Sequence, residues 1–226
     1  NRALNAFSFI NLMRSIYGKK LPDLGRIQDK GLLAVKIAQH FALRIDFLDE
    51  QVCRHLSKLF TNARPVKGKN GRELIESYVE KNWFDNFSSF DETPFTAASI
   101  GQVHNGVLNN DDSVVIKVIK EDFKQQFLRD LRSLRKLIKF SIKFYPKLRK
   151  VFNPLSILKH IEDYTISELD LRNEIQGSET LQQIIEIYKG RYDLSKLKLP
   201  KYYKELSNRN VLVTKRIEGH TFDDLL

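Results

Sequence analysis

Two neighbouring segments, residues 96–104 and 113–119, constrain the fold of this chain more than any other feature. The second alternates apolar side chains around Lys117, which is typical of a half-buried β-strand. The first is a run of small residues that leads into another short strand at 102–108, and the polar residues 109–112 between the strands favour a turn. The two segments therefore predict a β-hairpin that follows a small-residue loop.

A hairpin of this kind can bind a phosphate group. Small side chains leave the backbone N–H groups of a loop open to an anion, and a lysine in the next strand supplies a positive charge. An ordinary interpretation competes with this one, because small-residue loops are common and a lysine in a strand usually points to water. The hairpin alone leaves both interpretations open.

Helical periodicity dominates the rest of the chain. We predict helices at 30–44, 49–60, 72–81, 123–145 and 155–188. A buried strand is predicted at 210–217, before Gly219. Helices, two strands, long helices and one or two further strands indicate an α+β fold, in which helices cover a small sheet.

The predicted helix at 123–145 is strongly basic. Residues 120–150 contain eleven basic and three acidic side chains, and so carry eight of the ten excess positive charges of the chain. Its apolar residues form one stripe, and most of its basic residues, among them Arg129, Arg132, Arg135, Lys136, Lys139 and Lys143, lie outside that stripe. The helix could bind an anionic membrane surface or another acidic partner, or be a plain solvated face. Nucleic acid is the weaker candidate, because no nucleic-acid-binding motif accompanies the charge.

Acidic residues downstream could orient Lys117. In a regular helix Asp170 and Glu174 share a face, whereas Glu168 points away from them and is placed to meet Arg172. One hypothesis pairs Glu174 with Lys117 and directs Asp170 toward a bound ion or a second basic group. The alternative is a solvated helix face with one ion pair.

Lys36 and Gln39 lie three residues apart in an apolar helix and share a face. Buried polar groups need partners, because an unpaired buried charge is costly. Asp170 or Glu168 could supply the anion for Lys36. Alternatively, Lys36 reaches water from the edge of its helix.

Taken together, these motifs resemble the N-terminal half of the UbiB/ABC1/ADCK family of atypical protein-kinase-like proteins. The resemblance runs from about Gly25 to the end of the chain. It rests on the Lys-x-Gly-Gln-like motif Lys36–Gln39, the Arg-Ile-Asp-Phe-Leu segment 44–48, the alanine-rich loop within 90–104, the Val-Ile-Lys strand 115–117, the Glu-Leu-Asp motif 168–170 with Glu174, and a last strand and hinge at 210–225, with Thr214 near the gatekeeper. Ala38 replaces the family's signature glycine, and Thr96 replaces the first alanine of the loop.

The resemblance implies a kinase-like N-lobe, a small antiparallel sheet with helices, behind an N-terminal helical extension. We expect the extension at 1–82 and the N-lobe at 83–226, with inserted basic helices at about 120–160 and the hinge at the end. No catalytic loop or Asp-Phe-Gly triplet follows the hinge in this sequence. The C-lobe is therefore absent from it, and we expect the chain to be part of a longer protein.

The resemblance also implies an activity: binding of ATP with Mg²⁺, and hydrolysis or phosphoryl transfer in support of ubiquinone (coenzyme Q) biosynthesis or related lipid metabolism. Lys117 and Glu174 would be the catalytic residues present, and Lys36, Gln39, Glu168 and Asp170 would close the site against protein substrates. The implied nucleotide-binding residues are Thr96, Ala97, Ala98, Ser99, Ile100, Gly101, Gln102, Lys117, Lys215, Arg216 and Ile217. The metal ligands are expected mainly in the missing C-lobe.

A second function remains open, that of a nucleotide-sensing or scaffold protein that binds lipid or other lipid-biosynthesis proteins without catalysis. We expect an intracellular, membrane-associated location, at an inner membrane or, in a eukaryote, in a mitochondrion or plastid. One cysteine fits a reducing compartment, and residues 1–16 are amphipathic and unlike a secretory signal. No apolar run approaches the ~20 residues of a membrane-spanning helix.

Overall fold

A computed structural model of the chain describes residues 6–61, 71–98, 100–119, 122–144 and 153–219. They form two compact units. Unit 1 comprises residues 1–66, 97–101 and 120–169, and unit 2 comprises residues 67–96, 102–119 and 170–226. Each unit thus combines segments that are far apart in the sequence.

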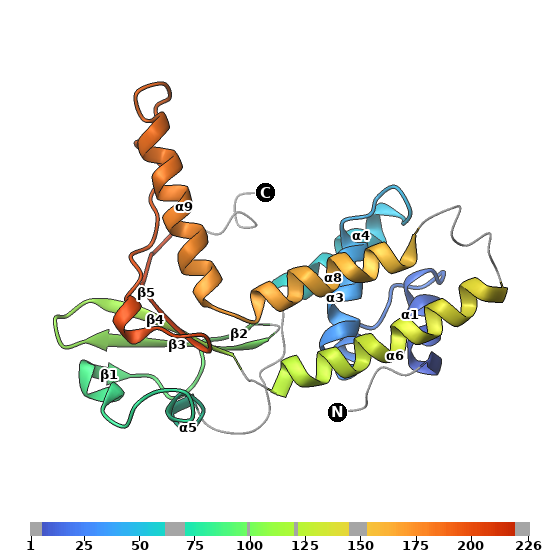
Figure 1. The fold of residues 1–226 in the computed structure, drawn as a ribbon, viewed down its shortest axis with the longest axis horizontal. Helices are drawn as coiled ribbons and strands as arrows, with labels where there is room; N and C mark the ends of the chain where they lie inside the picture. The colour runs from blue at the N-terminus through green and yellow to red at the C-terminus, as the bar shows by residue number, and fades with distance from the viewer. Residues whose placement is uncertain (1–5, 62–70, 99, 120–121, 145–152, 220–226) are drawn as a thin grey trace. The chain divides into compact units, whose positions relative to one another are not determined.

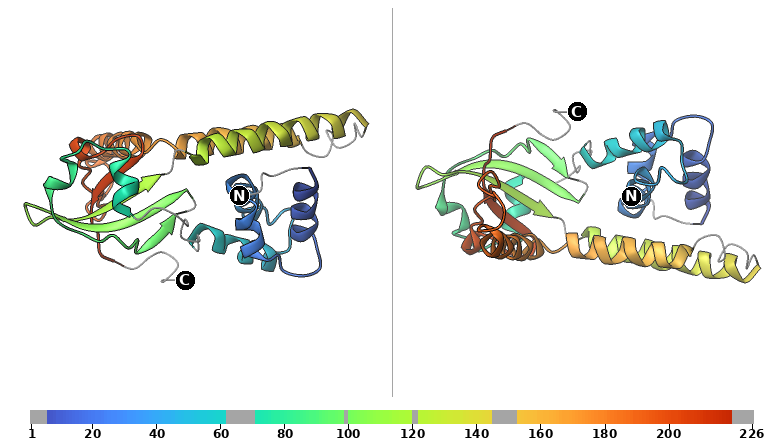
Figure 2. Two further views of the ribbon diagram at one scale, coloured as in Figure 1. Left: turned by 90° about the horizontal axis from the view of Figure 1, so that it is seen from below. Right: turned by 90° about the horizontal axis from the view of Figure 1, so that it is seen from above.

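Unit 1 is helical. Its described helices are α1 (Ala6–Ile16), α2 (Leu24–Asp29), α3 (Leu32–Ala42), α4 (Glu50–Thr61), α6 (Asp122–Phe144) and α8 (Pro154–Glu168). The helices α6 and α8 run side by side, and α3 packs against both of them as well as against α4 and α1 (Figures 1 and 2). This arrangement places α3 at the centre of unit 1.

The central helix α3 is buried along most of its length. Every residue from Leu32 to Gln39 is buried, the charged Lys36 included. The helix begins after Gly31, whose φ of 95° lies in the left-handed region that favours glycine. An apolar helix of this kind gains its stability from packing on several sides, so the polar residues within it need partners inside the unit.

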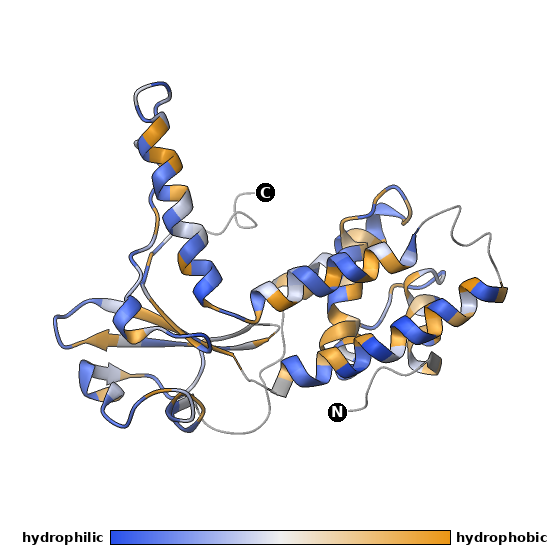
Figure 3. Cartoon of the chain, viewed as in Figure 1, coloured by the Kyte–Doolittle hydropathy of each residue, from blue (hydrophilic) through white to orange (hydrophobic). Residues whose placement is uncertain are grey.

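The long helix α6 has an apolar and a basic face, as the sequence predicts (Figure 3). Phe127, Leu131 and Leu134 are buried. Its exposed basic residues are Arg129, Arg132, Lys136, Lys139 and Lys143. Arg135 departs from this pattern, because it is half-buried and donates to the Glu162 carboxylate at 2.6 Å.

Unit 2 is built on a small sheet. The strands of the sheet are β1 (Phe87–Phe90), β2 (Thr96–Ala98), β3 (Gly101–Leu108), β4 (Ser113–Ile119) and β5 (Val211–Lys215), and of these residues Ala97, Ala98 and Gly101 are counted in unit 1. The order is β1-β3-β4-β5, with β2 also paired to β3, and the pairs β1–β3 and β4–β5 are antiparallel. The α+β class with a small antiparallel sheet is therefore confirmed.

Short helices and a side-chain core cover one face of this sheet. The short helices are α5 (Gly71–Glu76) and the 3-10 turns η1 (Trp83–Asn86) and η2 (Lys204–Leu206). The longer helix α9 (Arg172–Tyr188) begins just after the point in the chain, between residues 169 and 170, where unit 2 resumes. The core includes Trp83, whose indole N–H donates to the Leu206 carbonyl at 3.0 Å. This bond ties the segment before β1 to the segment before β5.

Two predicted helices differ from the structure. The helix predicted at 72–81 ends at Glu76. The helix predicted at 155–188 is broken into α8 and α9. The backbone N–H of Leu171 donates to the Arg209 carbonyl rather than to a carbonyl one turn earlier in the chain, and helical geometry is interrupted there.

None of the helices in the described ranges combines the length and the apolar run that crossing a bilayer requires.

Candidate functional site

The strand β4 sets the position of Lys117. Along this strand Val114, Ile116 and Val118 are buried in the core, whereas Lys117 is half-buried and belongs to the alternate set of positions. Because successive strand residues face opposite sides of a sheet, Lys117 lies on the face away from this core. Its ammonium forms an ion pair with the Glu174 carboxylate.

Glu174 is held near Lys117 by the start of α9. It lies in the first turn of this helix, where a carboxylate interacts favourably with the helix dipole. The backbone N–H of Leu171, just before α9, donates to the Arg209 carbonyl at 3.0 Å. Arg209 precedes β5, and Leu212 of β5 pairs with Lys117 in the sheet. Both members of the ion pair are thus positioned by the same strand.

The Lys117–Glu174 pair is accessible to water. The side chains are 26% and 40% exposed. Exposed ion pairs contribute little to stability, about 0–1 kcal/mol. The predicted pairing is therefore present, and its exposure leaves the ammonium within reach of an anionic ligand.

The Glu-Leu-Asp motif is divided between the two units. Asp170 belongs to unit 2, where it accepts hydrogen bonds from the Arg172 guanidinium at 2.9 and 2.6 Å and lies 3.9 Å from Arg209. The hydrogen bonds from Arg172 lower the pKa of Asp170. The predicted meeting of Glu168 with Arg172 is wrong, because it assumed a continuous helix through the motif.

Glu168 lies in unit 1 and pairs with Lys36. The Lys36 side chain is 6% exposed and that of Glu168 27%, so this pair is more buried than Lys117–Glu174. Lys36 also lies over the ring of Tyr164, 5.3 Å from its centroid, and hydrogen bonding to Glu168 raises the pKa of Tyr164. Of the two anions that the sequence offers for Lys36, the structure selects Glu168.

Gln39 faces a different neighbour. Its side-chain amide donates to the Leu59 carbonyl near the end of α4 at 2.9 Å. The bond is buried and ties α3 to α4 within unit 1. Ala38 is fully buried beside it. The side-chain amide of Gln39 is therefore bonded to Leu59 and not to Glu168, the partner of Lys36.

The small-residue segment forms part of a hairpin. Thr96, Ala97 and Ala98 lie in β2, which pairs with β3, and Thr96 is exposed. The backbone N–H of Phe95 donates to the Val103 carbonyl at 3.0 Å. The segment predicted as a loop thus includes a strand, and Ser99 lies outside the described residues.

The end of this segment is buried. Ile100 and Gln102 are 4% exposed, and Gly101 is also buried. The Gln102 side-chain oxygen lies 3.3 Å from Nε2 of His104. The structure thus places the Gln102 side chain inside unit 2 rather than on its surface.

The predicted hinge is engaged in bonds of its own. The backbone N–H of Lys215 donates to the Lys201 carbonyl at 2.8 Å, and that of Arg216 donates to the Ser113 carbonyl at 2.9 Å. Neither N–H group is available to a nucleotide base while these bonds hold. Ile217 is 60% exposed.

A cluster around Asp112 fixes the hinge to the β3–β4 turn. Asp112 accepts hydrogen bonds from Lys215 at 2.7 Å and from the Tyr203 hydroxyl at 2.6 Å. The bonds from Lys215 and Tyr203 lower the pKa of Asp112 to about 2. Burial, together with the Asp112 carboxylate, raises the pKa of Tyr203 to about 12.

Sequence reasoning missed Tyr164, Arg172 as the partner of Asp170, and the Asp112 cluster. Tyr164 could have been found, because it lies four residues before Glu168 and shares a helix face with it. No local pattern marks the helix break that joins Asp170 to Arg172, because apolar residues two apart also occur in the continuous helix α3. The Asp112–Tyr203 contact spans 91 residues, and no local pattern indicates it.

Within the ranges that the structure describes, no group of three or more His, Cys, Asp and Glu side chains is gathered to hold a metal ion.

Comparisons with known proteins extend over most of the chain. Residues 58–226 match the ABC1 atypical kinase-like domain. Proteins named "Probable protein kinase UbiB" match as well. Those of Vibrio vulnificus and Aeromonas salmonicida are 28% identical over 200 residues and 29% identical over 215 residues, which is 88% and 92% of this chain. The chain spans only 36% and 38% of the length of these two relatives.

A solved structure is also similar to the chain. It is the complex of Rv3197 with erythromycin from Mycobacterium tuberculosis, with a TM-score of 0.49 and 22% sequence identity. The match covers 94% of this chain and 49% of that one.

Proposed function

Because the chain belongs to the ABC1 atypical kinase-like family, with three quarters of its residues inside the matched domain, we propose that it forms the ATP-binding part of an atypical kinase or ATPase. The observation that carries this proposal is the Lys117–Glu174 ion pair. The two residues lie 57 positions apart in the sequence, and they meet on the sheet face away from the core of unit 2.

The residues present fit a nucleotide phosphate. A lysine held by a glutamate on a neighbouring helix is the arrangement that positions phosphates in kinases. The ammonium of Lys117 would hold phosphate oxygens, and Glu174 would fix its direction. The exposure of the pair supports this role, because an ammonium already buried in protein contacts could not accept a ligand.

Mg²⁺ would enter with the nucleotide. This ion keeps several water ligands and is commonly bound by substrate phosphates with one or two carboxylates. When bound, it would neutralise charge that develops on the phosphates. Residues of this chain would do the rest. Lys117 would bind and orient the phosphates, and the segment from Thr96 to Gln102 would cover them.

The four residues of the predicted regulatory motif have a proposed role in substrate selection, and the structure suggests how Gln39 would take part in it. We propose that Lys36, Gln39, Glu168 and Asp170 limit access of protein substrates. The pair Lys36–Glu168 is internal to unit 1, and Gln39 ties α3 to α4. Gln39 would therefore act by holding the helix that carries Lys36, rather than by contacting a substrate.

The biological setting follows from the family. We propose that the protein supports ubiquinone biosynthesis or related lipid metabolism at a membrane, inside the cell. The exposed basic residues of α6 are the proposed contact with anionic lipid, because Lys and Arg near an anionic surface each contribute about 1 kcal/mol of attraction. Other lipid-biosynthesis proteins are proposed partners.

Nucleotide binding is tested by thermal unfolding of the natural full-length protein with ATP and Mg²⁺. A ligand at 100 times its dissociation constant stabilises the folded state by about 2.7 kcal/mol. Lys117→Ala should lose this stabilisation, and the matched change Lys198→Ala, at an exposed position of unit 2, should keep it. Unchanged stabilisation in Lys117→Ala would refute the site.

The same samples distinguish the two candidate functions. Release of inorganic phosphate from ATP, or transfer of phosphate to an acceptor, supports the enzyme. Binding that depends on Lys117 without any turnover supports the nucleotide-sensing scaffold.

A further inference from the structure

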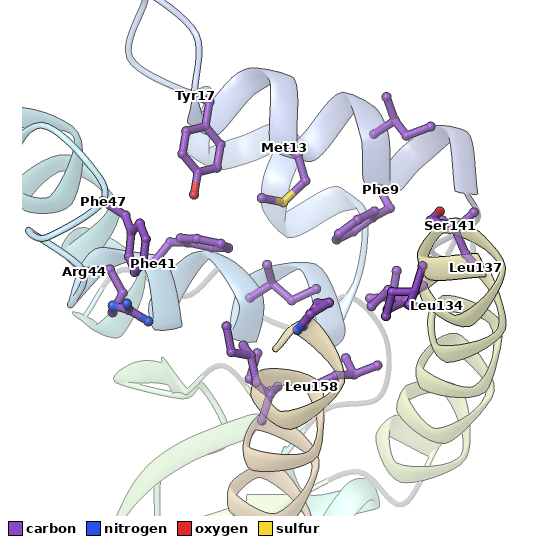
Figure 4. A pocket seen from close by; sticks show the side chains of 17 residues that line it. Phe9, Met13, Tyr17, Phe41, Arg44, Phe47, Leu134, Leu137, Ser141 and Leu158 are labelled. Carbon is purple, nitrogen blue, oxygen red and sulfur yellow. The ribbon is translucent and has the colours of Figure 1, made fainter. Parts of the chain in front are cut away.

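Unit 1 contains a cavity of about 460 Å³ among α1, α3, α6 and α8 (Figure 4). Phe9 and Met13 of α1, together with Tyr17 just after this helix, face it from one side, and Leu134 and Leu137 of α6 face it from another. Its volume lies in the range of ~300–1,000 Å³ that is usual for small-molecule sites. Every residue that lines it belongs to unit 1, so the cavity does not depend on unit 2.

The walls of the cavity are almost entirely apolar. Arg44, Tyr17 and Ser141 are the residues with polar side chains among those that line it. The Arg44 guanidinium already donates two hydrogen bonds to Asp46, at 2.8 and 2.7 Å, and lies 4.1 Å from the centroid of the Phe47 ring. A nucleotide or sugar would lose its bonds to water here with little in return, which is costly. The cavity therefore suits a hydrocarbon chain.

Part of the apolar lining of the cavity reaches the surface. The lining residues Ile10 and Phe47, which we call the apolar rim, are each 44% exposed. Exposed apolar side chains at the mouth of an apolar cavity suit a contact with a membrane or with another molecule.

The helix α6 indicates which of these contacts applies. One of its faces lines the cavity through residues such as Leu137 and Ile138. Its exposed positions Arg132, Lys136 and Lys139 carry positive charge, and α6 as a whole has seven basic and two acidic residues. Because the apolar face of α6 packs inside unit 1, its basic face is the one left to the outside, where Lys and Arg are attracted to the surface of an anionic bilayer.

We propose that this cavity binds the hydrocarbon tail of a lipid drawn from an anionic membrane. The apolar rim contacts the bilayer, the basic face of α6 attracts its headgroups, and the tail enters between α1 and α6. The inference shares with the proposed function the contact of α6 with a membrane, and it does not require nucleotide binding.

Photocrosslinking tests the proposal. The natural full-length protein is mixed with vesicles of equimolar phosphatidylcholine and phosphatidylglycerol that contain a phospholipid with a diazirine on its acyl chain. After irradiation, the modified residues are mapped by mass spectrometry. We expect adducts on inward-facing residues such as Met13, Phe41 and Ile138. Adducts confined to exposed positions such as Phe7 and Ile45 would overturn the proposal.

A cavity-filling variant sharpens the test. Leu137→Trp should reduce the inner adducts about tenfold, equivalent to about 1.4 kcal/mol of binding free energy. The matched variant Leu181→Trp, at an exposed apolar position of α9, should leave them unchanged. In the wild-type protein, excess oleate should displace the probe from the inner residues whether or not Leu137→Trp folds. Inner adducts that persist under oleate would contradict a tail site.

Charge reversal tests the source of the lipid. Arg132→Glu, Lys136→Glu and Lys139→Glu together should lower the inner adducts, as should vesicles of phosphatidylcholine alone. The control variant changes three exposed basic residues of unit 2, Arg191, Lys196 and Lys198, to glutamate and should leave the inner adducts unchanged. Equal labelling from neutral vesicles would refute delivery from an anionic surface. Lys117→Ala should not alter the adducts, so loss of the nucleotide site and loss of the tail site are told apart.

Discussion

Each unit of the chain contains a lysine–glutamate ion pair from the predicted motifs, and the two pairs differ in their exposure to water. Lys36 in unit 1 is 6% exposed, whereas Lys117 in unit 2 is 26% exposed and its partner Glu174 40%. A buried charge depends on its partner, because removal of the partner leaves the charge unpaired inside the protein. An exposed charge does not depend on its partner in this way, because water can solvate it, and so it can exchange that partner for a ligand.

This difference assigns different roles to the two lysine–glutamate pairs. The Lys36–Glu168 pair joins α3 to α8 and helps to hold unit 1 together. The Lys117–Glu174 pair contributes little to folding, and its position on the outer face of β4 suits the binding of an anion. Mutations that change one partner at a time test whether the two pairs contribute differently to stability.

The largest effect is expected from Glu168→Ala. This change leaves the buried Lys36 ammonium without its carboxylate, and loss of one partner of a buried pair costs about 3 kcal/mol or more. Urea unfolding should show this loss of unfolding free energy. The control Glu186→Ala removes an exposed pair with Lys189 and should cost less than about 1 kcal/mol.

A double variant distinguishes the cost of an unpaired Lys36 charge from the cost of losing the ion pair as a whole. Lys36→Met with Glu168→Leu removes both charges and should recover most of the loss, because apolar replacement of a buried pair is often neutral or stabilising. A double variant as unstable as Glu168→Ala would contradict this account of unit 1.

A smaller effect is expected from pH. His104 in unit 2 is fully buried, and burial lowers its pKa, although a hydrogen bond with the Asp91 carbonyl acts in the opposite direction. Above the unfolded pKa of about 6.5 both states are neutral. As the pH falls below that value the unfolded state gains a proton that the folded state does not, so stability decreases by up to about 1.4 kcal/mol per pH unit.

The contribution of His104 is isolated by comparison with His104→Gln. Urea unfolding between pH 7 and pH 5 should show a steeper decrease for the wild type than for the variant. Equal slopes would show that His104 is not held neutral in the folded state.

The smallest effect on folding is expected from Lys117→Ala. Because the pair with Glu174 is exposed, its removal should change the free energy of unfolding by no more than about 1 kcal/mol. A loss as large as that of Glu168→Ala would remove the distinction between the two pairs. The measurement is urea unfolding without nucleotide.

Local patterns predicted much of unit 2. The alternation around Lys117 identified β4 with the bounds that the structure gives, and the strand at 210–217 contains β5. The residues alone offer the pairing of Lys117 with Glu174 only beside the alternative of a solvated helix face, because no periodicity links residues that far apart, and the family resemblance favours the pairing. The resemblance to the UbiB/ABC1/ADCK family is confirmed by the match of residues 58–226.

The errors lie where packing overrides local pattern. The predicted helix at 155–188 runs through Leu169 and Leu171, whereas in the structure the Leu171 N–H bonds to the distant Arg209 carbonyl and the helix is interrupted. The apolar cavity of unit 1 could not be predicted, because its shape depends on how the side chains of four helices fill the space between them. Gln39 illustrates the same limit, since its partner is a backbone carbonyl of another helix.

The central claim is that Lys117 contacts a nucleotide phosphate, and an acyl-phosphate derivative of ATP tests it most directly. This reagent transfers its acyl group to a lysine that lies beside the bound phosphates, and mass spectrometry identifies the modified residue. We predict acylation of Lys117 that excess ATP with Mg²⁺ prevents. Acylation of other lysines with Lys117 unmodified, or labelling of Lys117 that ATP does not prevent, would contradict the account.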